Sequence, residues 1–593
     1  MVFFVGGECR YVGGGSFYLL CQVSYRGCNG GHWFRLSLRI GNYRCPPSTN
    51  LPPVPSSATP SPQSTSGVPR GASAVAAGIF LSRLAGLVRE SLLRSVLALG
   101  PAADAFAAAL RIPNILQNLL GEGSLSASFI PVYSRLLSED KEEEAARVAG
   151  AVAGLLAALA GVFAVIAIFA ARPLTALLTP GFSGQRFELT VDLMRITTAG
   201  AGILVVSAWC LGVLNSHRQF FLSYVAPVLW NVAQIAVLVA ALFGGWDPVD
   251  AATGVAWGLV VGGLLQFGVQ AIAVRKLLPG LRPTLQHRLP GVAEVRRRFL
   301  PAVAGRGVVQ LSAYLDLVLA SFLATGALAA LMSAQVLYLL PISLFAMSVA
   351  AAELPEMSRT EDQSVLISRV DTSLRRTSFF VVFSAVAYLS VGEQIVNALF
   401  GWGAFSADDA RLVWLVLGAY SLGLPAIAIS RQLQNTCYAL GNTAGPARIA
   451  GIRVGVSAVI GLALMFPLDN YAIMGGAFVS NQSAGPHLGA VGLALGSAVA
   501  SFVEAIFLIR LLRRSLPALP AVSLIFMRLA PAAALAFLVA AGLKFWLLDL
   551  PALLAAPLIV GFTGLLYTVT AQRTGVAEAH LILGPVRRRI WRS

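Results

Sequence analysis

Residues 148–171, VAGAVAGLLAALAGVFAVIAIFAA, form an apolar stretch without a charged side chain. An α-helix needs about 20 apolar residues to cross the hydrocarbon layer of a membrane, so this stretch is long enough to span it. The chain of 593 residues is 57% apolar and only 12% charged. One soluble core cannot bury that much apolar surface. The sequence therefore predicts a protein whose helices lie in lipid.

Comparable apolar stretches follow one another from Ala74 onward, with short connections between them. We count about fourteen that have the length of a membrane-spanning helix. The predicted spans are 74–98, 103–133, 148–171, 188–214, 221–244, 251–274, 299–324, 327–353, 374–397, 411–437, 446–467, 489–511, 523–546 and 551–572. The predicted fold class is therefore an all-α integral membrane protein.

Basic residues gather in alternate connections between these spans. The even-numbered connections hold most of the arginines and lysines, whereas the odd-numbered ones are nearly bare. Lys and Arg are retained on the cytoplasmic side of a membrane, so we expect both ends of the helical region to be cytoplasmic. This topology explains the net charge of +16 without a nucleic-acid partner, although a basic loop could also hold anionic lipid.

The first 73 residues lack the long apolar period of the rest. They contain four of the six cysteines and a Pro/Ser/Thr-rich linker from Pro46 to Pro69. The spacing of Cys9, Cys21, Cys28 and Cys45 matches no paired C-x-x-C zinc pattern. We therefore expect residues 1–73 to be a disordered extension, or the product of translation begun upstream of the true start.

A short repeat divides the helical region. The pattern P-x-x-S-R occurs at 131–135 and again at 355–359, in both cases at the predicted cytoplasmic end of a span. Two parallel lobes of six helices would place these ends symmetrically, as in many transporters. The predicted parts are an N-lobe, a C-lobe, and two extra spans with a basic cytoplasmic tail, at 74–285, 286–515 and 516–593.

Charged side chains interrupt the first span. Ser82, Arg83, Arg89, Glu90 and Arg94 lie in an otherwise apolar helix. A charge near the centre of the bilayer costs several kcal/mol unless it meets a partner or water. By helix geometry the first two arginines lie about 13 Å and about 22 Å from the cytoplasmic end and about 120° apart. We expect Ser82, Arg83 and Arg89 to border a polar cavity.

The second span carries polar residues more densely. Asp104, Arg111, Asn118 and Glu122 are separated by seven, seven and four residues, which places them on one face of a helix, near Asn114. Prolines and glycines weaken this span, and broken helices are tolerated where they line a cavity. All five are candidate substrate-binding residues.

A structural alternative explains the same charges without a cavity. Arg83 or Arg89 could pair with Asp104 or Glu122 across the two helices, so that the charges only neutralise each other.

Asp316 is a lone acid in the seventh span. It could bind a coupling cation, balance the arginines, or pair with Arg306 on the same span, and the sequence does not separate these alternatives. Five histidines are scattered along the chain without an H-E-x-x-H pattern, so we expect no metal site and no catalytic residue.

At this point the residues resemble a known family. Residues 81–137, LSRLAGLVRESLLRSVLALGPAADAFAAALRIPNILQNLLGEGSLSASFIPVYSRLL, are similar to the opening segment of the MurJ/MviN lipid II flippases, which belong to the multidrug/oligosaccharidyl-lipid/polysaccharide exporter superfamily. The resemblance covers nearly everything after residue 73. It continues through Thr179–Phe182, Leu214–Asn215, Ala226–Pro227, Asn231 and Ala320–Ala324.

The resemblance implies two lobes in a V around a cationic central cavity, which takes the diphosphate and sugar of lipid II and opens to one side of the membrane at a time. In such proteins arginines on the first, second and eighth helices and an aspartate at the start of the second are critical. Arg83, Arg89 and Asp104 match by motif, and Glu122 in the G-E-G turn matches too. The last two spans are expected to form a groove for the polyprenyl tail.

Two positions depart from the family pattern. Gln117 stands where the P-N-L-L-R motif has arginine, and Val336 stands where the A-D-R-L motif of the eighth helix has arginine. Arg111, or Arg306 on the seventh helix, could replace part of the missing charge. Lipid II is still the favoured cargo, but the loss of these two arginines affects how the protein binds it.

The function implied is a lipid II flippase of the bacterial inner membrane that acts in peptidoglycan biosynthesis. Alternatives are a flippase for another polyprenyl-diphosphate sugar, a related exporter or a membrane glycosyltransferase. We expect no cofactor, while a coupling monovalent ion or the membrane potential is left open as the driving force. The expected partners are the cargo and membrane lipid, and the chain is expected to be a monomer, with association with the cell-wall synthesis machinery left open.

Overall fold

The computed structural model describes residues 20–26, 33–39, 70–360, 362–480, 485–547 and 549–581. Contacts divide the chain into two units, Met1–Gly67 and Val68–Ser593. In the first unit, strands β1 (Leu20–Arg26) and β2 (Trp33–Arg39) form an antiparallel hairpin. Residues of β2 alternate between apolar and polar, a period typical of strands. The expectation that residues 1–73 are a disordered extension, or the product of translation begun upstream of the true start, stays a prediction.

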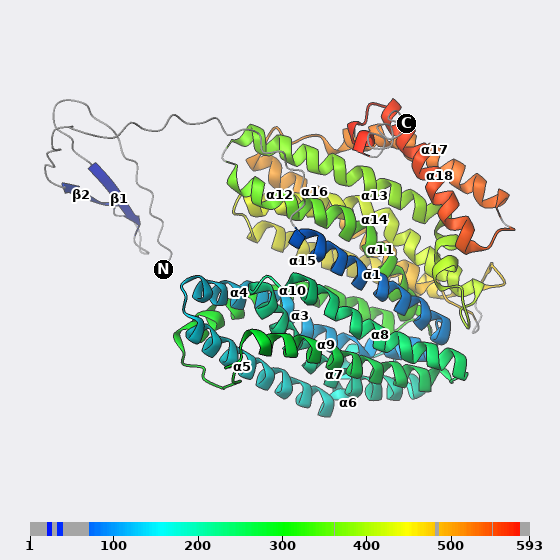
Figure 1. The fold of residues 1–593 in the computed structure, drawn as a ribbon. Helices are drawn as coiled ribbons and strands as arrows, with labels where there is room; N and C mark the ends of the chain where they lie inside the picture. The colour runs from blue at the N-terminus through cyan, green and yellow to red at the C-terminus, as the bar shows by residue number, and fades with distance from the viewer. Residues whose placement is uncertain are drawn as a thin grey trace, which may run out of the picture. The chain divides into compact units, whose positions relative to one another are not determined.

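The second unit consists almost entirely of helices (Figure 1). Its first helices are α1 (Arg70–Leu97), α2 (Pro101–Ala109), α3 (Arg111–Leu120), α4 (Glu122–Ser138), α5 (Glu142–Phe169), α6 (Ala171–Leu178), α7 (Gly184–Ser216), α8 (Phe220–Gly244), α9 (Pro248–Leu277) and α10 (Pro290–Ser321). Next come α11 (Ala327–Pro341), the π-helix η1 (Ile342–Met347), α12 (Ser348–Arg359), α13 (Gln363–Phe400), α14 (Ala407–Ala439) and α15 (Ala444–Asp469). The last elements are strands β3 (Tyr471–Met474) and β4 (Ala477–Ser480), helices α16 (Gly489–Ser515), α17 (Val522–Trp546) and α18 (Ala552–Arg573), and the short η2 (Ala577–Ala579).

Eleven helical segments of the described residues are long and apolar enough to cross a membrane. Three of the predicted spans fall outside this set, namely α1, the broken helix α2–α4, and α10. These three contain the charged residues singled out above, so their composition reflects the polar interior of the protein. The all-α membrane fold is confirmed.

The helices of the second unit pack as two groups (Figure 1). In the first group α7 packs against α2–α5 and α9, while α8 packs against α9. In the second group α14 contacts α11, α13 and α16, and α15 packs along α16. Helix α1 lies between the groups, because it packs along α8 and also touches α13. Helices α17 and α18 add to the second group by packing on α13.

Helix α10 joins the two groups. It packs against α4 and touches α5 and α6 in the first group, and it contacts α11, α15 and α16 in the second. Pro301 lies inside this helix, and a proline removes one backbone hydrogen bond from the helix interior. A change in the distance between the two groups would therefore move or bend helix α10.

The second predicted span is broken at Gly121. This residue has φ −87° and ψ −143°, which interrupts the helix between α3 and α4. A side chain there would collide with the carbonyl oxygen of Gln117, so glycine is the residue that permits the break. The predicted single face from Asp104 to Glu122 is therefore interrupted twice, at Leu110 between α2 and α3 and at Gly121 between α3 and α4. The prolines and glycines had indicated a weakened span, but the shared face was inferred from the spacing of a continuous helix.

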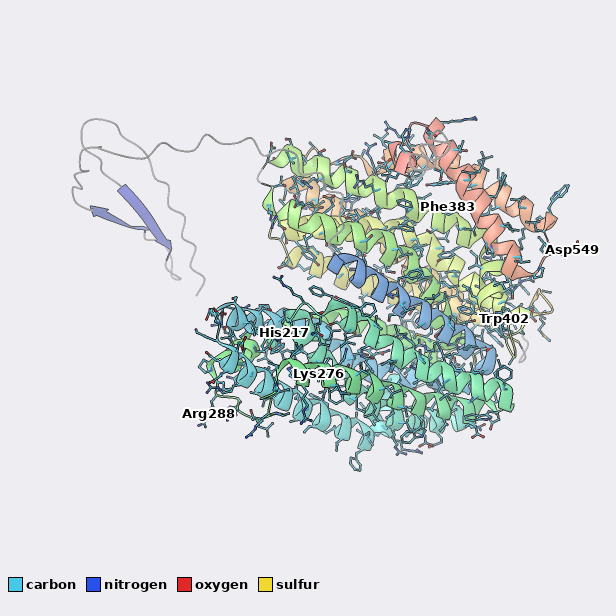
Figure 2. All side chains as sticks on the ribbon, in the orientation of Figure 1. His217, Lys276, Arg288, Phe383, Trp402 and Asp549 are labelled. Atoms are coloured by element: carbon cyan, nitrogen blue, oxygen red, sulfur yellow. The ribbon has the colours of Figure 1, made fainter. Side chains whose placement is uncertain are left out.

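The two ends of the second unit differ in charge. Helices α4, α7 and α9 end, and α5 and α10 begin, at one end, which we call the basic face. Arg135, Lys141, Arg147, Arg275 and Lys276 lie there. Figure 2 shows His217 and Arg288 at this end, with Trp402 and Asp549 at the other. We call that other end the opposite face.

Candidate functional site

A cavity of about 150 Å³, lined by both charged and apolar side chains, lies where the two helix groups meet. Helices α1, α2, α3, α7, α8, α9 and α11 all contribute to its lining. The residues that give it polar character are Arg89, Glu90, Arg94, Asn114 and Gln117. The first and second predicted spans thus meet at a cavity, as their charged side chains had indicated.

Arg89 is the cation that remains partly open to this cavity. Its guanidinium carbon lies 5.0 Å from the ring centroid of Trp230 on α8. One of its terminal nitrogens lies 3.6 Å from a carboxylate oxygen of Glu90, and 19% of the side chain is exposed. A cation stacked on tryptophan is stabilised electrostatically by the ring, so Trp230 fixes the guanidinium while leaving its edge free.

Arg94 and Glu90 form a closed pair one helical turn apart. Two nitrogens of Arg94 donate to the same Glu90 oxygen at distances of 3.1 and 2.9 Å. Only 2% of the Arg94 side chain and 7% of the Glu90 side chain are exposed. Two guanidinium groups therefore face one carboxylate, which leaves the cavity with a net positive charge carried mainly by Arg89.

Arg111 does not belong to the cavity lining, although it contacts Met332, which does. One of its terminal nitrogens donates to the sulfur of Met332 on α11 at 3.0 Å. Its buried Nε atom has no hydrogen-bond partner among the described residues. Asp316 of α10 is an opposite charge near Arg111, but the described residues place no carboxylate within 4.0 Å of it. The direct contact of Arg111 outside its own helix group is therefore the thioether of Met332 on α11.

Asp104 does not line the cavity with the arginines. Its side chain is fully buried and accepts hydrogen bonds from the backbone nitrogens of Gly326 and Ala329, at 2.8 and 2.9 Å. Arg186 of α7 donates to the same carboxylate at 3.3 Å. The predicted substrate-binding role is therefore corrected for this structure: Asp104 ties α2 to the start of α11 near the opposite face.

The remaining predicted site residues divide into three sets. Asn114 lines the cavity. Arg83 is exposed, Ser82 is half-buried and Asn118 is exposed, and none of these three belongs to the cavity lining. The side chains of Glu122 and Arg306 lie outside the described side chains.

The pairing alternative was wrong for two of its residues. Arg89 interacts with Glu90 on its own helix, and Asp104 interacts with Arg186.

Asp316 is half-buried, and both Arg111 and Arg453 interact with it electrostatically. No ion pair of Asp316 is present among the described side chains, so its role as counter-charge or cation site stays a prediction.

Both departures from the expected motif fall on the cavity wall. Gln117 of α3 and Val336 of α11 line it together with Arg89. The two positions therefore affect cargo binding directly. The cavity carries less positive charge than a cavity with arginine at both positions, as in the family motif.

Sequence reasoning missed three contributors to the site. Trp230 lies in an apolar helix, and nothing local distinguishes it from the other tryptophans. Met332 is likewise one apolar residue among many. Arg186 lies in the first turn of α7 and pairs with Asp104, which is 82 residues away in the sequence, so no local pattern indicates this contact.

The fold and the cavity define a multi-pass membrane transporter in which two helix groups enclose a cationic chamber. The family model described as "Lipid II flippase MurJ" matches residues 93–556. The chain therefore belongs to the lipid II flippase MurJ family.

Relatives from several bacteria agree with this assignment. The chain is 32% identical over 395 residues to the probable lipid II flippase MurJ of Rhizobium tropici, covering 65% of this chain and 73% of that protein. It is 31% identical over 452 residues to the corresponding protein of Bdellovibrio bacteriovorus, covering 75% and 82%. It is 30% identical over 444 residues to the lipid II flippase MurJ of Burkholderia cenocepacia, covering 73% and 82%.

Solved structures share the fold. A lipid II flippase MurJ in an inward closed conformation matches with a TM-score of 0.67 and 22% identity, over 83% of this chain and 97% of that one. An inward-facing multidrug transporter of the MATE family matches with a TM-score of 0.56 and 16% identity, over 76% and 99%. At these identities the likeness concerns the fold alone.

Proposed function

We propose that this protein carries lipid II across the bacterial inner membrane, from the cytoplasmic to the outer leaflet, by alternating access. The observation that supports this most directly is the partly exposed guanidinium of Arg89 in a chamber between two helix groups. Family membership makes lipid II the expected cargo. The basic face is then cytoplasmic, by the distribution of Lys and Arg.

The physical problem is the headgroup. Two phosphates and the attached sugars cannot cross about 30 Å of hydrocarbon unaided, because their charges would lose their hydration. A polar chamber that opens to one leaflet at a time removes that barrier. An arginine stays charged at any relevant pH and forms strong hydrogen bonds to phosphate oxygens. Arg89 would supply this contact, with Asn114 and Gln117 as further polar groups.

The polyprenyl tail needs no polar chamber. It can remain in lipid while the headgroup moves, and we propose that the surface of α17 and α18 guides it. These helices are added to the second group through α13, where the Tyr567 hydroxyl donates to the Phe379 carbonyl at 2.9 Å. As the driving force we propose the membrane potential or a monovalent ion gradient.

Alternating access requires that the contacts which close the chamber on one side of the membrane can break. The contacts of Asp104 with Gly326 and Ala329 join the two groups near the opposite face. We propose that these contacts break when the chamber turns toward the outer leaflet. Helix α10, which touches both groups, would bend or straighten in the same step.

Complementation tests the proposal. The native flippase of a bacterium is depleted, and the full chain is expressed in its place. We expect growth to be restored by the native sequence and by Arg147→Gln, an exposed arginine on α5. Growth is expected to fail with Arg89→Gln, although the protein reaches the membrane. Rescue by Arg89→Gln equal to that by the native sequence would refute the role of the cavity.

A second cargo is favoured by one observation. Gln117 and Val336 leave the cavity wall less cationic than the family motif predicts, which suits a headgroup with less negative charge. The alternative function is therefore the transport of another polyprenyl-linked oligosaccharide. Reconstituted vesicles that carry either lipid II or a polyprenyl monophosphate sugar would separate the two, because only the true cargo should change leaflet faster than in empty vesicles.

A further inference from the structure

A second pocket lies away from the central cavity, between α4, α5 and α10. Its volume is about 390 Å³. Leu125 of α4, Val152 and Leu156 of α5, and Val295 of α10 form buried walls. Leu300, which is exposed, borders its mouth. The pocket is therefore apolar inside and accessible from the side of the helix bundle that faces lipid.

Basic residues border this pocket at the basic face. Arg296 belongs to its lining and also to that of an adjoining hollow of about 620 Å³, which Arg297 lines as well. His287 contributes to the apolar pocket from the connection between α9 and α10. The apolar space thus continues, past Arg296 and Leu300, into a hollow whose charged lining residues are Arg296, Arg297 and Glu294.

Among the described residues, Arg296 and Arg297 have no carboxylate within 4.0 Å. The acid nearest in sequence, Glu294, is already bound by Arg135 of α4 at 2.6 Å and by Arg298 at 2.7 Å. Its charge is therefore offset within the protein. Two exposed guanidinium groups remain beside the pocket for an external anion.

The connection that completes the pocket is packed closely on α5. The Thr284 backbone nitrogen donates to the Gly150 carbonyl at 3.1 Å. Side chains at Gly150 or Gly154 would collide with the backbone of Arg282 and Thr284. Two glycines one turn apart therefore let the connection lie directly against the helix. The pocket and its basic border are formed without a ligand.

We propose that this pocket binds a phospholipid with an anionic headgroup from the leaflet at the basic face. One acyl chain would occupy the space between Leu125, Leu156 and Val295, and the phosphate would contact Arg296 and Arg297. Burial of apolar surface favours the chain, and charge-assisted hydrogen bonds favour the phosphate. The site lies outside the cargo path and does not depend on the identity of the cargo.

Topology alone does not account for this arrangement. Membrane topology depends on how many Lys and Arg residues a connection contains, and not on where in the connection they lie. Arg275 and Lys276 at the end of α9 contribute to that number, yet they border neither pocket. Arg296 and Arg297 instead lie where an acyl chain and a phosphate can be held together. Because α10 contacts both helix groups, a lipid here would also touch the helix that joins them.

Photo-crosslinking to the purified full chain in nanodiscs tests the proposal. The probe is phosphatidylglycerol with a diazirine at the end of one acyl chain, and the comparison is phosphatidylcholine with the same chain. We expect the anionic probe to label peptides of α5 and α10 about fivefold more than the zwitterionic one. One basic residue near an anionic lipid contributes about a factor of five, so the double variant Arg296→Gln/Arg297→Gln should lower labelling about tenfold or more.

The matched control is Arg275→Gln/Lys276→Gln, which removes two equally exposed charges from the same face and should leave labelling within twofold. A second variant, Val152→Phe, fills the pocket and should lower labelling by both probes while the circular dichroism spectrum is retained. Equal labelling by the two probes, or equal losses in the two double variants, would overturn the proposal. Displacement of the probe by equimolar lipid II would also overturn it, because the pocket would then hold the tail of the cargo.

Discussion

The carboxylate of Asp104 lies 2.8 Å from the backbone nitrogen of Gly326, although 222 residues separate them. Gly326 has φ +92° and is the N-cap residue of α11, and a side chain there would collide with the Leu99 carbonyl oxygen. The acid of one helix group thus satisfies a free N–H group at the start of a helix in the other. This contact, with the one to Ala329, closes the protein near the opposite face.

Asp104→Asn should weaken this closure. The side-chain amide of asparagine has one oxygen, which can accept from only one of the two backbone N–H groups, and its NH₂ group faces the second N–H. One hydrogen bond to a charged group, worth roughly 1.5–3 kcal/mol, is therefore lost. We expect the population to shift toward a form open at the opposite face. Spin labels on α5 and α13 near that face should report longer distances by pulsed electron resonance.

The matched control for that measurement is Asp192→Asn, which removes an exposed acid of α7 whose one ion pair among the described side chains is with Arg195. Its distance distribution should equal that of the native protein. An unchanged distribution in Asp104→Asn would mean that the closure is maintained without this carboxylate.

Removing Trp230 should loosen Arg89. Trp230→Leu keeps an apolar side chain but deletes the ring that holds the guanidinium, a contribution of about 0.5–2 kcal/mol. We expect binding of lipid II to weaken by roughly three- to thirtyfold, and Trp230→Phe to retain most of it. Native mass spectrometry of the protein titrated with lipid II measures both. Equal affinities in the native protein and Trp230→Leu would exclude the positioning role.

These two residues mark where sequence reasoning succeeded and where it stopped. Arg89 could be predicted, because a charge inside an apolar helix is costly and so indicates a polar chamber. Trp230 could not, because its importance comes from a contact between α1 and α8 that no local pattern encodes. Eleven helical segments among the described residues were predictable from apolar length alone, which is a property of each segment separately.

Asp104 shows a different limit. Its place on a face with Arg111 and Glu122 followed from helical spacing, but Gly121 breaks the helix before that face is complete. Its true partners, Gly326 and Ala329, are backbone groups of a distant helix. Such contacts depend on how the two helix groups meet, and the sequence pattern of one span does not contain that information.

Arg111 and Asp316 should be energetically coupled. They are opposite charges near each other on α3 and α10, so removing one weakens the electrostatic stabilisation of the other. We expect Arg111→Gln and Asp316→Asn each to lower thermal stability in detergent, and the double variant to lose less than the sum. The coupling should fall within about 0.5–3 kcal/mol. Strictly additive losses would contradict the interaction.

Acid should weaken the junction between α4 and α7. His217, just after α7, lies 2.9 Å from the Tyr133 hydroxyl, and burial lowers the pKa of this imidazole below its usual value of 6.5. A lowered pKa in the folded state means that stability is present above pH 6.5 and is lost as pH falls through the folded pKa. We expect the melting temperature to drop between pH 7.5 and 5, and His217→Gln to reduce that drop. An identical pH profile in the variant would contradict this assignment.

Restoring the missing arginine at Gln117 should identify the cargo. Gln117 is half-buried on the cavity wall with Arg89, so Gln117→Arg would add a second guanidinium facing the same space. A diphosphate can use both cations, and a hydrogen bond to a charged group is worth about 1.5–3 kcal/mol. If lipid II is the cargo, its affinity should rise about tenfold or more and fall with added salt.

The control for that gain is Asn118→Arg, which adds the same charge at an exposed position of α3 outside the cavity lining. Its affinity for lipid II should stay within about twofold of the native value, because an exposed charge is screened by solvent. A monophosphate lipid offers fewer oxygens to two cations, so it should gain less than lipid II from Gln117→Arg. A larger gain for the monophosphate lipid would contradict lipid II as the cargo and favour the alternative headgroup, because the native cavity would then be adapted to one phosphate.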